Sequence, residues 1–324
     1  MLIEDQHPDS KSIMLAVLGA PNVGKSSLIN YMLGTDLTIV TNRPQTTRNR
    51  FHCILTIDHT EIILVDTPGL HRSNLEFNKR MNEQARGGTM GADLNLLLID
   101  MSHNVLPQFQ EFARQMEEQE LAETWVVFSK LDLVKDPSAL PIEEIMTAAK
   151  EIVPSITNHY LLSSKTGDNV HQLTGDICDR APESPHHYIN GDISNRNERF
   201  FATEYIREQA FQLLKEEIPY EVAVLIEEYR DFKDKETREN VDTHISAAIL
   251  VNRPSQRGIV VGKQGSMIKE IGTRARKKIA AMTGGKVHLN LHVKVSPKWF
   301  KNNWVLEEIG LPRAQDSNRV WRAR

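Results

Sequence analysis

The sequence contains little cysteine and no long apolar run. Its 324 residues include only two cysteines, Cys53 and Cys178, which are too few for a disulfide framework, so a reducing cytoplasmic environment is the simplest expectation. No apolar stretch reaches the roughly 18–20 residues that a membrane-spanning helix needs. The polar, acidic residues 1–12 are unlike a secretory signal, and we expect a short disordered tail there. Internal repeats and low-complexity stretches are also absent.

The charge is unevenly distributed along a chain long enough for two domains. Hydrophobic residues at 40% and charged residues at 25% are typical of a globular protein. Residues 253–324 contain 16 Lys and Arg against 4 Asp and Glu, a balance of +12, whereas the whole chain carries −4. A basic C-terminal region on an acidic body suggests a polyanionic partner, with an ordinary solvated surface as the alternative.

Strand-like and helix-like stretches alternate in the first half of the chain. Strands are expected at the apolar runs 13–19, 61–66, 94–100, 124–129 and 158–163. Helical spacing occurs between them, for example at 25–34, 105–119 and 141–152. This alternation predicts an α/β domain with a mostly parallel sheet and helices on both faces. Ligands bind such sheets at the C-terminal ends of the strands.

A phosphate-binding loop follows the first predicted strand. Residues 19–26 read GAPNVGKS and lie between a strand and a helix, as this loop requires. The two glycines allow backbone N–H groups to turn toward phosphates, Lys25 can reach the β- and γ-phosphates, and the Ser26 hydroxyl can ligate Mg²⁺. The predicted phosphate-binding residues are Gly19, Ala20, Pro21, Asn22, Val23, Gly24, Lys25, Ser26 and Ser27.

Two further segments are expected to face the γ-phosphate. The sequence DTPG directly follows a strand, so Asp66 can hold Mg²⁺ through water and the Gly69 N–H can sense the phosphate. A threonine of the preceding loop could complete the Mg²⁺ shell only with GTP bound, and we favour Thr47 over Thr46. The predicted members are Asp66, Thr67, Pro68, Gly69 and Leu70, with Gln45, Thr46, Thr47, Arg48 and Asn49 as switch I; the predicted Mg²⁺ ligands are Ser26, Thr47 and Asp66.

The last two strands are followed by residues that can read guanine. Ser129-Lys130-Leu131-Asp132 resembles the Asn-Lys-x-Asp motif of GTPases, in which the carboxylate accepts from N1–H and the 2-amino group of the base. Ser129 departs from the motif, and because a hydroxyl is shorter than an amide and offers one donor instead of two, affinity is expected to fall while selectivity remains. The stretch Leu162, Ser163, Ser164 and Lys165 resembles the Ser-Ala-Lys element, whose backbone N–H reads guanine O6.

A different fold is expected in the second half. A helix near 202–216, strands near 220–230 and 243–252, a Gly-x-x-Gly loop, a helix near 266–281, a strand near 286–295 and a helix near 298–309 suggest an α+β type II KH domain. In such domains this loop clamps the backbone of about four nucleotides of a single strand. The predicted RNA-binding residues are Gly262, Lys263, Gln264, Gly265, Lys269, Arg276 and Lys277.

The ordered motifs resemble the translation-factor-related GTPases, and together with the second half they resemble the Era family of bacterial ribosome-assembly GTPases. The resemblance runs from about residue 13 to 310 and rests on GAPNVGKSSLIN, QTTR, DTPGLH, IPYEVAV, VVGKQGSMIKEIG and VKVSPKW. It implies Mg²⁺-dependent hydrolysis of GTP to GDP and binding of the 3′ end of small-subunit ribosomal RNA on the pre-small subunit. It also implies peripheral contact with the inner membrane, and we expect a monomer.

These expectations divide the chain into five parts. They are a tail at 1–12, a GTPase domain at 13–180, a linker at 181–201, a KH domain at 202–310 and a basic tail at 311–324.

The alternatives to this interpretation come from two other classes. A phosphate-loop ATP enzyme is disfavoured by Asp132 and by the DTPG element. A membrane-associated signalling GTPase whose second domain binds protein is disfavoured by the basic C-terminal region and the Gly-x-x-Gly loop.

Slow intrinsic hydrolysis is expected because Leu70 stands where Ras-like GTPases carry the water-positioning Gln. Asn22 resembles the Asn that holds K⁺ in cation-activated GTPases, which suggests a K⁺ site; the alternative is that Asn22 only caps the loop.

Overall fold

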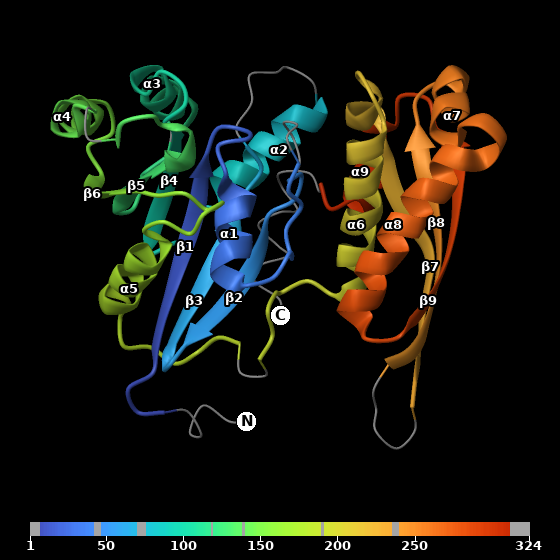
Figure 1. Ribbon diagram of the computed structural model, residues 1–324, viewed down its shortest axis with the longest axis horizontal. Helices are drawn as coiled ribbons and strands as arrows, with labels where there is room; N and C mark the ends of the chain where they lie inside the picture. The colour runs from blue at the N-terminus through green and yellow to red at the C-terminus, as the bar shows by residue number, and fades with distance from the viewer. Residues whose placement is uncertain are drawn as a thin grey trace. The chain divides into compact units, whose positions relative to one another are not determined.

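The computed structural model describes residues 7–41, 47–69, 76–117, 119–137, 140–188, 191–234 and 240–311. The chain divides into two compact units, one ending at Asn195 and the other beginning at Arg196 (Figure 1). Among the described residues, no helix is long and apolar enough to cross a membrane.

The first unit is built on a six-stranded sheet in the order β2-β3-β1-β4-β5-β6. Only β2 runs antiparallel to its neighbour; the other described pairings are parallel. The strands are β1 (Lys11–Gly19), β2 (Phe51–Ile57), β3 (Thr60–Asp66), β4 (Leu94–Asp100), β5 (Thr124–Ser129) and β6 (Ile156–Leu161). The helices are α1 (Lys25–Leu33), α2 (Glu76–Gly87), α3 (Leu106–Gln115), α4 (Ile142–Ile152) and α5 (Val170–Arg180), and a 3₁₀ turn spans Leu131–Leu133.

Both faces of this sheet are buried, as a mostly parallel sheet requires. On one face, Leu18, Ile99 and Phe128 pack with Phe109 of α3 and Met146 of α4. The residues that alternate with them along the strands are also buried, and the helices α1 and α5 contact β3. The continuous apolar runs of the sequence therefore correspond to strands covered on both sides, and the mostly parallel sheet is confirmed.

Strand β1 begins at Lys11, two residues earlier than the sequence suggested, so Lys11 and Ser12 belong to the sheet and not to a tail. The two residues pair with Thr60 and Glu61 of β3, and the Ser12 hydroxyl donates to the Glu61 carboxylate at 2.8 Å. This extension depends on a partner strand far along the chain, which explains why the local apolar pattern does not reveal it.

The first part of the expected linker packs against the first unit. Glu61 is fully buried, and its carboxylate accepts from the backbone N–H groups of His187 and Tyr188, each at 2.8 Å. Farther along, the Ile54 N–H donates to the Ile193 carbonyl oxygen at 2.9 Å, so the segment continues along the free edge of β2. A buried carboxylate needs hydrogen-bond partners, and this segment supplies them.

The second unit has a three-stranded sheet in the order β7-β8-β9, with β7 and β8 antiparallel and β8 and β9 parallel. The elements are α6 (Glu198–Leu213), β7 (Ala223–Lys233), β8 (Asn240–Val251), α7 (Pro254–Val261), α8 (Ser266–Thr283), β9 (Lys286–Val295) and α9 (Asn303–Glu308). The helices α6 and α8 pack together and α8 contacts β9. This order confirms the α+β domain expected from the sequence. Helix α7 was not anticipated, and the last helix is shorter than 298–309.

Candidate functional site

A cleft of about 1390 Å³ opens in the first unit, where the strands β1, β4 and β5 end. It brings together the phosphate loop, the DTPG element, the guanine-reading residues and Thr47. Its lining includes Ala20, Pro21, Asn22, Val23, Gly24, Lys25, Ser26, Ser27, Thr47, Gly69, Asp100, Lys130, Asp132, Ser164 and Lys165. The cleft lies at the C-terminal ends of the strands, as expected for a parallel sheet.

The phosphate loop needs its glycines for two different reasons. Gly19 has a φ of 135°, and a Cβ atom there would lie 2.6 Å from the Leu98 carbonyl oxygen, so a side chain would collide with β4. Gly24 has a φ of 107° and immediately precedes α1, whose N-terminus therefore faces the loop. The N–H groups of a first helical turn and the helix dipole together favour a bound phosphate.

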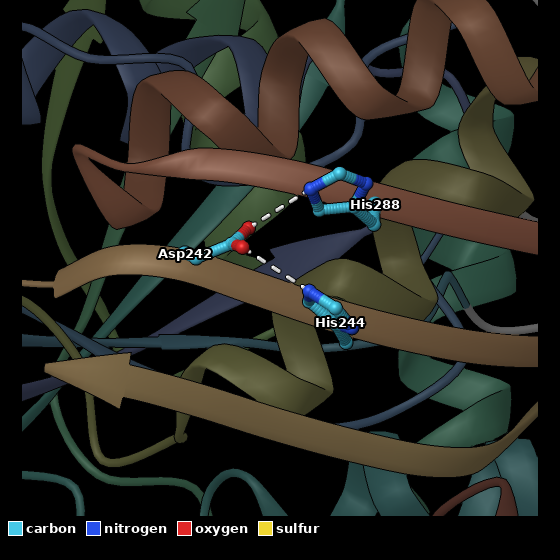
Figure 2. A group of neighbouring side chains, drawn as sticks. All are labelled: Asp242, His244 and His288. Atoms are coloured by element: carbon cyan, nitrogen blue, oxygen red, sulfur yellow. Dashed lines mark hydrogen bonds and ion pairs between the residues drawn. The ribbon is translucent and has the colours of Figure 1, made fainter.

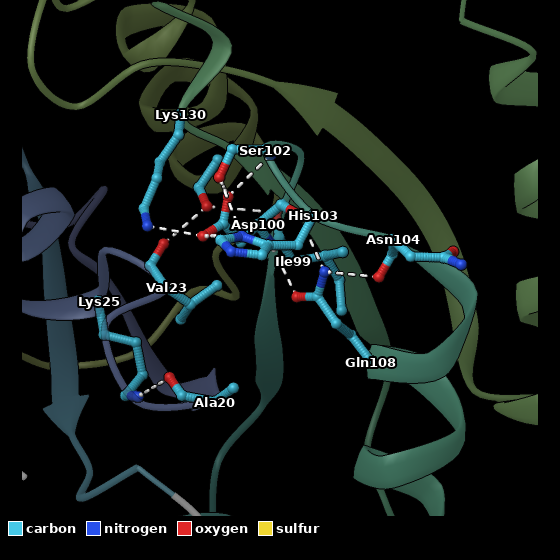
Figure 3. A network of polar contacts seen from close by, with 11 residues as sticks. Ala20, Val23, Lys25, Ile99, Asp100, Ser102, His103, Asn104, Gln108 and Lys130 are labelled. Atoms are coloured by element: carbon cyan, nitrogen blue, oxygen red, sulfur yellow. Dashed lines mark hydrogen bonds and ion pairs between the residues drawn. The ribbon is translucent and has the colours of Figure 1, made fainter. Parts of the chain in front are cut away.

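Lys25 is buried at the base of this loop. Its Nζ atom donates to the carbonyl oxygens of Gly19 and Ala20, both at 2.9 Å, and only 6% of the residue is exposed. Figure 3 shows the contact with Ala20. Burial lowers the pKa of Lys25 to about 8, and the carboxylate of Asp66 opposes this shift. The ammonium group is thus held by the loop's own carbonyl oxygens, beside the space that phosphates would occupy.

The three predicted Mg²⁺ ligands lie next to one another. The Ser26 hydroxyl and the Thr47 hydroxyl are 3.2 Å apart, and the Thr47 hydroxyl donates to the Asp66 carboxylate at 3.2 Å. All the donor atoms are oxygens, which suits a hard cation such as Mg²⁺. These residues therefore fit the metal that a phosphate-loop GTPase requires.

Other residues of the predicted switch region point elsewhere or lie outside the described residues. The Arg48 guanidinium lies 5.1 Å from the centroid of the Phe77 ring of α2, and neither Arg48 nor Asn49 lines the cleft. The Thr67 hydroxyl donates to the Val17 carbonyl oxygen at 2.6 Å. Gln45, Thr46 and Leu70 lie outside the described residues.

The two segments predicted to read guanine are held together around Asp132. The Ser163 hydroxyl donates to the Asp132 carboxylate at 2.7 Å, and the Lys165 Nζ atom lies 3.7 Å from its other oxygen. The Leu131 N–H donates to the Leu162 carbonyl oxygen at 3.1 Å. Two segments that are far apart in the sequence thus fix one carboxylate at the rim of the cleft.

Asp100, at the end of β4, is a site residue that the sequence analysis missed. Its carboxylate accepts from the Lys130 Nζ atom at 2.6 Å and from the Ser102 hydroxyl at 2.6 Å (Figure 3). Burial opposes ionisation of Asp100, but the hydrogen bonds from Lys130 and Ser102 outweigh this effect and hold the pKa of its carboxyl below the usual value. The carboxylate thus fixes the direction of the Lys130 stem. The position of Asp100 at the end of an apolar strand, like that of Asp66, is the sequence feature that could have identified it as a cleft residue.

Ser129 connects the guanine-reading motif to the phosphate loop. Its hydroxyl donates to the Val23 carbonyl oxygen at 2.6 Å and lies 3.2 Å from the Ile99 carbonyl oxygen, and the residue is 1% exposed. Although a serine is shorter than the usual asparagine, it therefore keeps a bond to the phosphate loop. Its one donor is occupied by this contact, so the hydroxyl has no proton left for a base.

The Gly-x-x-Gly loop joins α7 to α8 in the second unit. Gly262 has a φ of 74°, and a Cβ atom there would lie 2.7 Å from the Met267 Cβ atom, so only glycine fits. Lys263 and Gln264 are exposed at the tip of the loop. The other predicted contacts, Lys269, Arg276 and Lys277, are exposed on α8.

Comparisons with known proteins agree with both halves of this description. The family described as "50S ribosome-binding GTPase" matches residues 14–130, and the family described as "KH domain" matches residues 217–300. The chain is 37% identical to the GTPase Era of Thermotoga maritima over 302 residues, covering 93% of this chain and 97% of that one. It is also 37% identical to the GTPase Era of Carboxydothermus hydrogenoformans, covering 91% and 96%.

Two solved structures are similar over most of the chain. One is Era in complex with MgGDPNP and nucleotides 1506–1542 of 16S ribosomal RNA, with a TM-score of 0.83 and 30% identity over 94% of this chain and 100% of that one. The other is a single-residue variant of Aquifex aeolicus Era bound to GDP·AlF₄⁻, with a TM-score of 0.83, 29% identity and the same coverage.

The fold and the cleft thus define a phosphate-loop GTPase, which hydrolyses GTP to GDP and phosphate, joined to a KH domain. Within this class, the identity and coverage of its relatives show that the chain belongs to the Era family of GTPases.

Replacing Lys25 with Ala should weaken GTP and GDP binding by at least about tenfold. The change removes a charge-assisted hydrogen bond to the phosphates, typically about 1.5–3 kcal/mol, and each 1.4 kcal/mol is about tenfold in affinity. Titration with a fluorescent nucleotide would measure the loss, and circular dichroism would check the fold. Lys150→Ala, at an exposed position of α4, is the control. Wild-type affinity in the Lys25 variant would contradict the phosphate-loop assignment.

Ser129→Ala should weaken the binding of both GTP and GDP by about two- to tenfold, because the Val23 carbonyl oxygen loses a hydrogen bond of about 0.5–1.5 kcal/mol. Ser129→Asn should instead tighten binding several-fold, since an amide has a second donor for the base. The control is Ser164→Ala, where the backbone is expected to carry the contact. Unchanged affinity in both Ser129 variants would mean that this position does not influence the nucleotide.

Proposed function

We propose that this chain is a GTP-controlled switch that binds the 3′ end of small-subunit ribosomal RNA and assists assembly of the small subunit. The observation that carries the proposal is the joint presence of a complete GTPase cleft and an exposed Gly-x-x-Gly loop that opens a basic helix. Its support from relatives is the solved Era complex with nucleotides 1506–1542 of 16S ribosomal RNA. The basic C-terminal region favours RNA over a protein ligand for the second domain.

The phosphate loop binds the triphosphate and stabilises charge during hydrolysis. The backbone N–H groups around Gly24 and the N-terminus of α1 face the phosphates, and Lys25 provides the positive charge. Ser26, Thr47 and Asp66 would hold Mg²⁺, which when bound would neutralise charge on the phosphates. Leu70 cannot orient water, so intrinsic hydrolysis is slow.

Selectivity for guanine rests on Asp132. Its carboxylate accepts from the two neighbouring donors of guanine, whereas adenine does not present this pair. Ser163 and Lys165 hold the carboxylate at the rim of the cleft, and Lys130, fixed by Asp100, covers the base with its apolar stem. GTP and GDP are thus preferred over adenine nucleotides.

RNA binding rests on the loop at 262–265 and on α8. The glycines allow phosphates to approach the backbone closely, and Lys263 adds a cation at the tip. Lys269, Arg276 and Lys277 extend the basic surface along the helix. The Arg274 side chain is paired with Glu270 at 2.7 Å, and Lys278 is paired with Glu208 at 2.7 Å, so these two cations are partly neutralised.

The remaining assignments follow from membership of the family. We propose that the protein is a cytoplasmic monomer that makes peripheral contact with the inner membrane. We propose a GTPase domain from β1 to near residue 180, a connection that ends before α6 begins at Glu198, and a KH domain from there to about residue 310, with the residues before β1 and after 310 as terminal segments.

Replacing Lys263 and Gln264 together with Asp should abolish binding of a single-stranded fragment of the ribosomal 3′ tail and leave GTP binding intact. The two new carboxylates repel the RNA phosphates, and the substitution also removes the Lys263 cation. Folding should tolerate the change, because acidic residues near a helix N-terminus stabilise the helix by about 0.3–1 kcal/mol. Fluorescence anisotropy with labelled RNA measures the loss. Wild-type affinity should fall with salt, with a log–log slope of roughly −0.7 per neutralised phosphate.

The matched control is Lys150→Asp with Gln172→Asp, which makes the same change of charge at exposed positions of the first unit. If the loop variant bound RNA like the wild type, the loop would not be the RNA site. Loss of RNA binding in the control as well would indicate that total charge alone governs affinity.

GTP hydrolysis should be several-fold faster in K⁺ than in Na⁺, because a cation held by Asn22 would stabilise the developing charge. Asn22 has a φ of 60°, a conformation that glycine also adopts, so Asn22→Gly removes the amide without straining the loop. Steady-state phosphate release in the two salts measures the effect, and Asn22→Gly should lose it. Equal rates of the wild type in K⁺ and Na⁺ would eliminate the K⁺ site.

A further inference from the structure

A carboxylate and two imidazoles converge on the sheet of the second unit, far along the chain from the nucleotide cleft. His244 Nε2 lies 3.1 Å from one oxygen of Asp242, and His288 Nε2 lies 3.2 Å from the other (Figure 2). The ligand atoms of the three side chains all lie within 4.8 Å of one another. No element of the GTPase or RNA-binding assignments uses this cluster.

The register of the sheet makes this convergence a fixed property of the fold. Asp242 and His244 are two residues apart on β8 and therefore share a face. His288 of β9 is the register partner of His244. Thr243, which alternates with them, is fully buried, so the cluster occupies the open face of the sheet, and its two histidines are about half exposed. An ion in solution can reach it.

The geometry and the donor types suit a transition-metal ion. Zn²⁺ bonds of roughly 2.0–2.1 Å to nitrogen or oxygen place neighbouring ligands about 3.3 Å apart in a tetrahedron. Each Nε2 atom lies at close to this distance from its own oxygen of Asp242, 3.1 Å for His244 and 3.2 Å for His288, and the ligand atoms of all three side chains lie within 4.8 Å of one another. Imidazole favours Zn²⁺ and its neighbours in the transition series over Mg²⁺, which prefers oxygen donors. The all-oxygen donor set of the cleft therefore suits Mg²⁺, whereas the imidazole-containing cluster suits a transition-metal ion.

The aromatic ring of Phe232 lies beside the cluster. Phe232 is the register partner of Asp242 in β7, and its ring centroid lies 5.1 Å from that of His244. The His244 and His288 rings lie 4.6 Å apart, centroid to centroid. The aromatic neighbours restrict the two imidazoles, and a preorganised ligand loses less conformational entropy when it binds.

We propose that Asp242, His244 and His288 form a binding site for one divalent transition-metal ion such as Zn²⁺, with water completing the coordination. Each neutral imidazole would present its Nε2 lone pair to the ion and carry its proton on Nδ1. The bound ion would link β8 to β9 near the start of both strands. The site is independent of the proposed RNA binding and GTP hydrolysis.

The test uses the full chain loaded with MgGDP, so that the nucleotide cleft is filled, and Zn²⁺ as the probe. Competition with a chromophoric chelator gives affinity and stoichiometry, and Co²⁺ in place of Zn²⁺ reports tetrahedral coordination through its visible absorption. We expect one ion per chain in addition to the Mg²⁺. His244→Gln and His288→Gln should each weaken binding by at least about tenfold, the loss typical even of groups that only support a metal ligand.

The matched control is His292→Gln. His292 lies on β9, and its Nε2 atom is 3.3 Å from the Glu227 carboxylate, so it has the same histidine–carboxylate pairing without a second imidazole. Its variant should bind Zn²⁺ like the wild type. Circular dichroism and GDP affinity check that the variants fold, and Asp242→Asn provides a second test in which the shape of the side chain is kept.

Two results would overturn the proposal. One is the absence of stoichiometric Zn²⁺ uptake at micromolar concentrations, which would leave the cluster as a carboxylate lying beside two imidazoles. The other is uptake that His244→Gln, His288→Gln and Asp242→Asn leave unchanged, which would place the ion on other histidines of the chain.

Discussion

The nucleotide site depends on one constraint, the close approach of the phosphate loop to the ends of β1 and β4. At Gly19 the loop passes so near the Leu98 carbonyl that no side chain fits, and this closeness confines the Lys25 ammonium between two loop carbonyl oxygens. A buried cation is costly without partners. The carbonyl oxygens provide the partners, but burial still lowers the pKa of Lys25. Because the buried ammonium is incompletely compensated, the negative charge of a polyphosphate would stabilise it strongly.

Hydrogen bonds extend from this loop to two other parts of the cleft. Ser129 attaches the guanine-reading motif to Val23, and Asp100 holds Lys130 in turn. On the other side, Ser26 contacts Thr47, whose hydroxyl reaches Asp66. The residues predicted to bind the base, the phosphates and the metal are therefore connected through the phosphate loop. Ser129 keeps a bond between the two motifs, although its side chain is shorter than the usual asparagine.

The sequence predicts the parts of this protein that have local signatures. Glycines at fixed spacing, apolar runs and the DTPG element identify the loop, the parallel strands and many of the residues that line the cleft. What it misses depends on contacts distant in the chain. Strand β2 is defined by antiparallel pairing with β3, and Asp100 matters only because β5 places Lys130 beside it. Helix α7, with a glycine inside a short polar stretch, has little helical signal of its own.

The segment between the two units shows why such distant contacts matter for function. Thr47, a predicted Mg²⁺ ligand, lies four residues before β2, and the other edge of β2 pairs with Ile193 and Ser194, immediately before the second unit begins. The segment is also fixed to β3 through the fully buried Glu61. The segment that contains Thr47 therefore continues directly into the strand that holds the start of the connection. The end of the first unit is therefore held by hydrogen bonds to two strands of its sheet, β2 and β3, and is not a free tether.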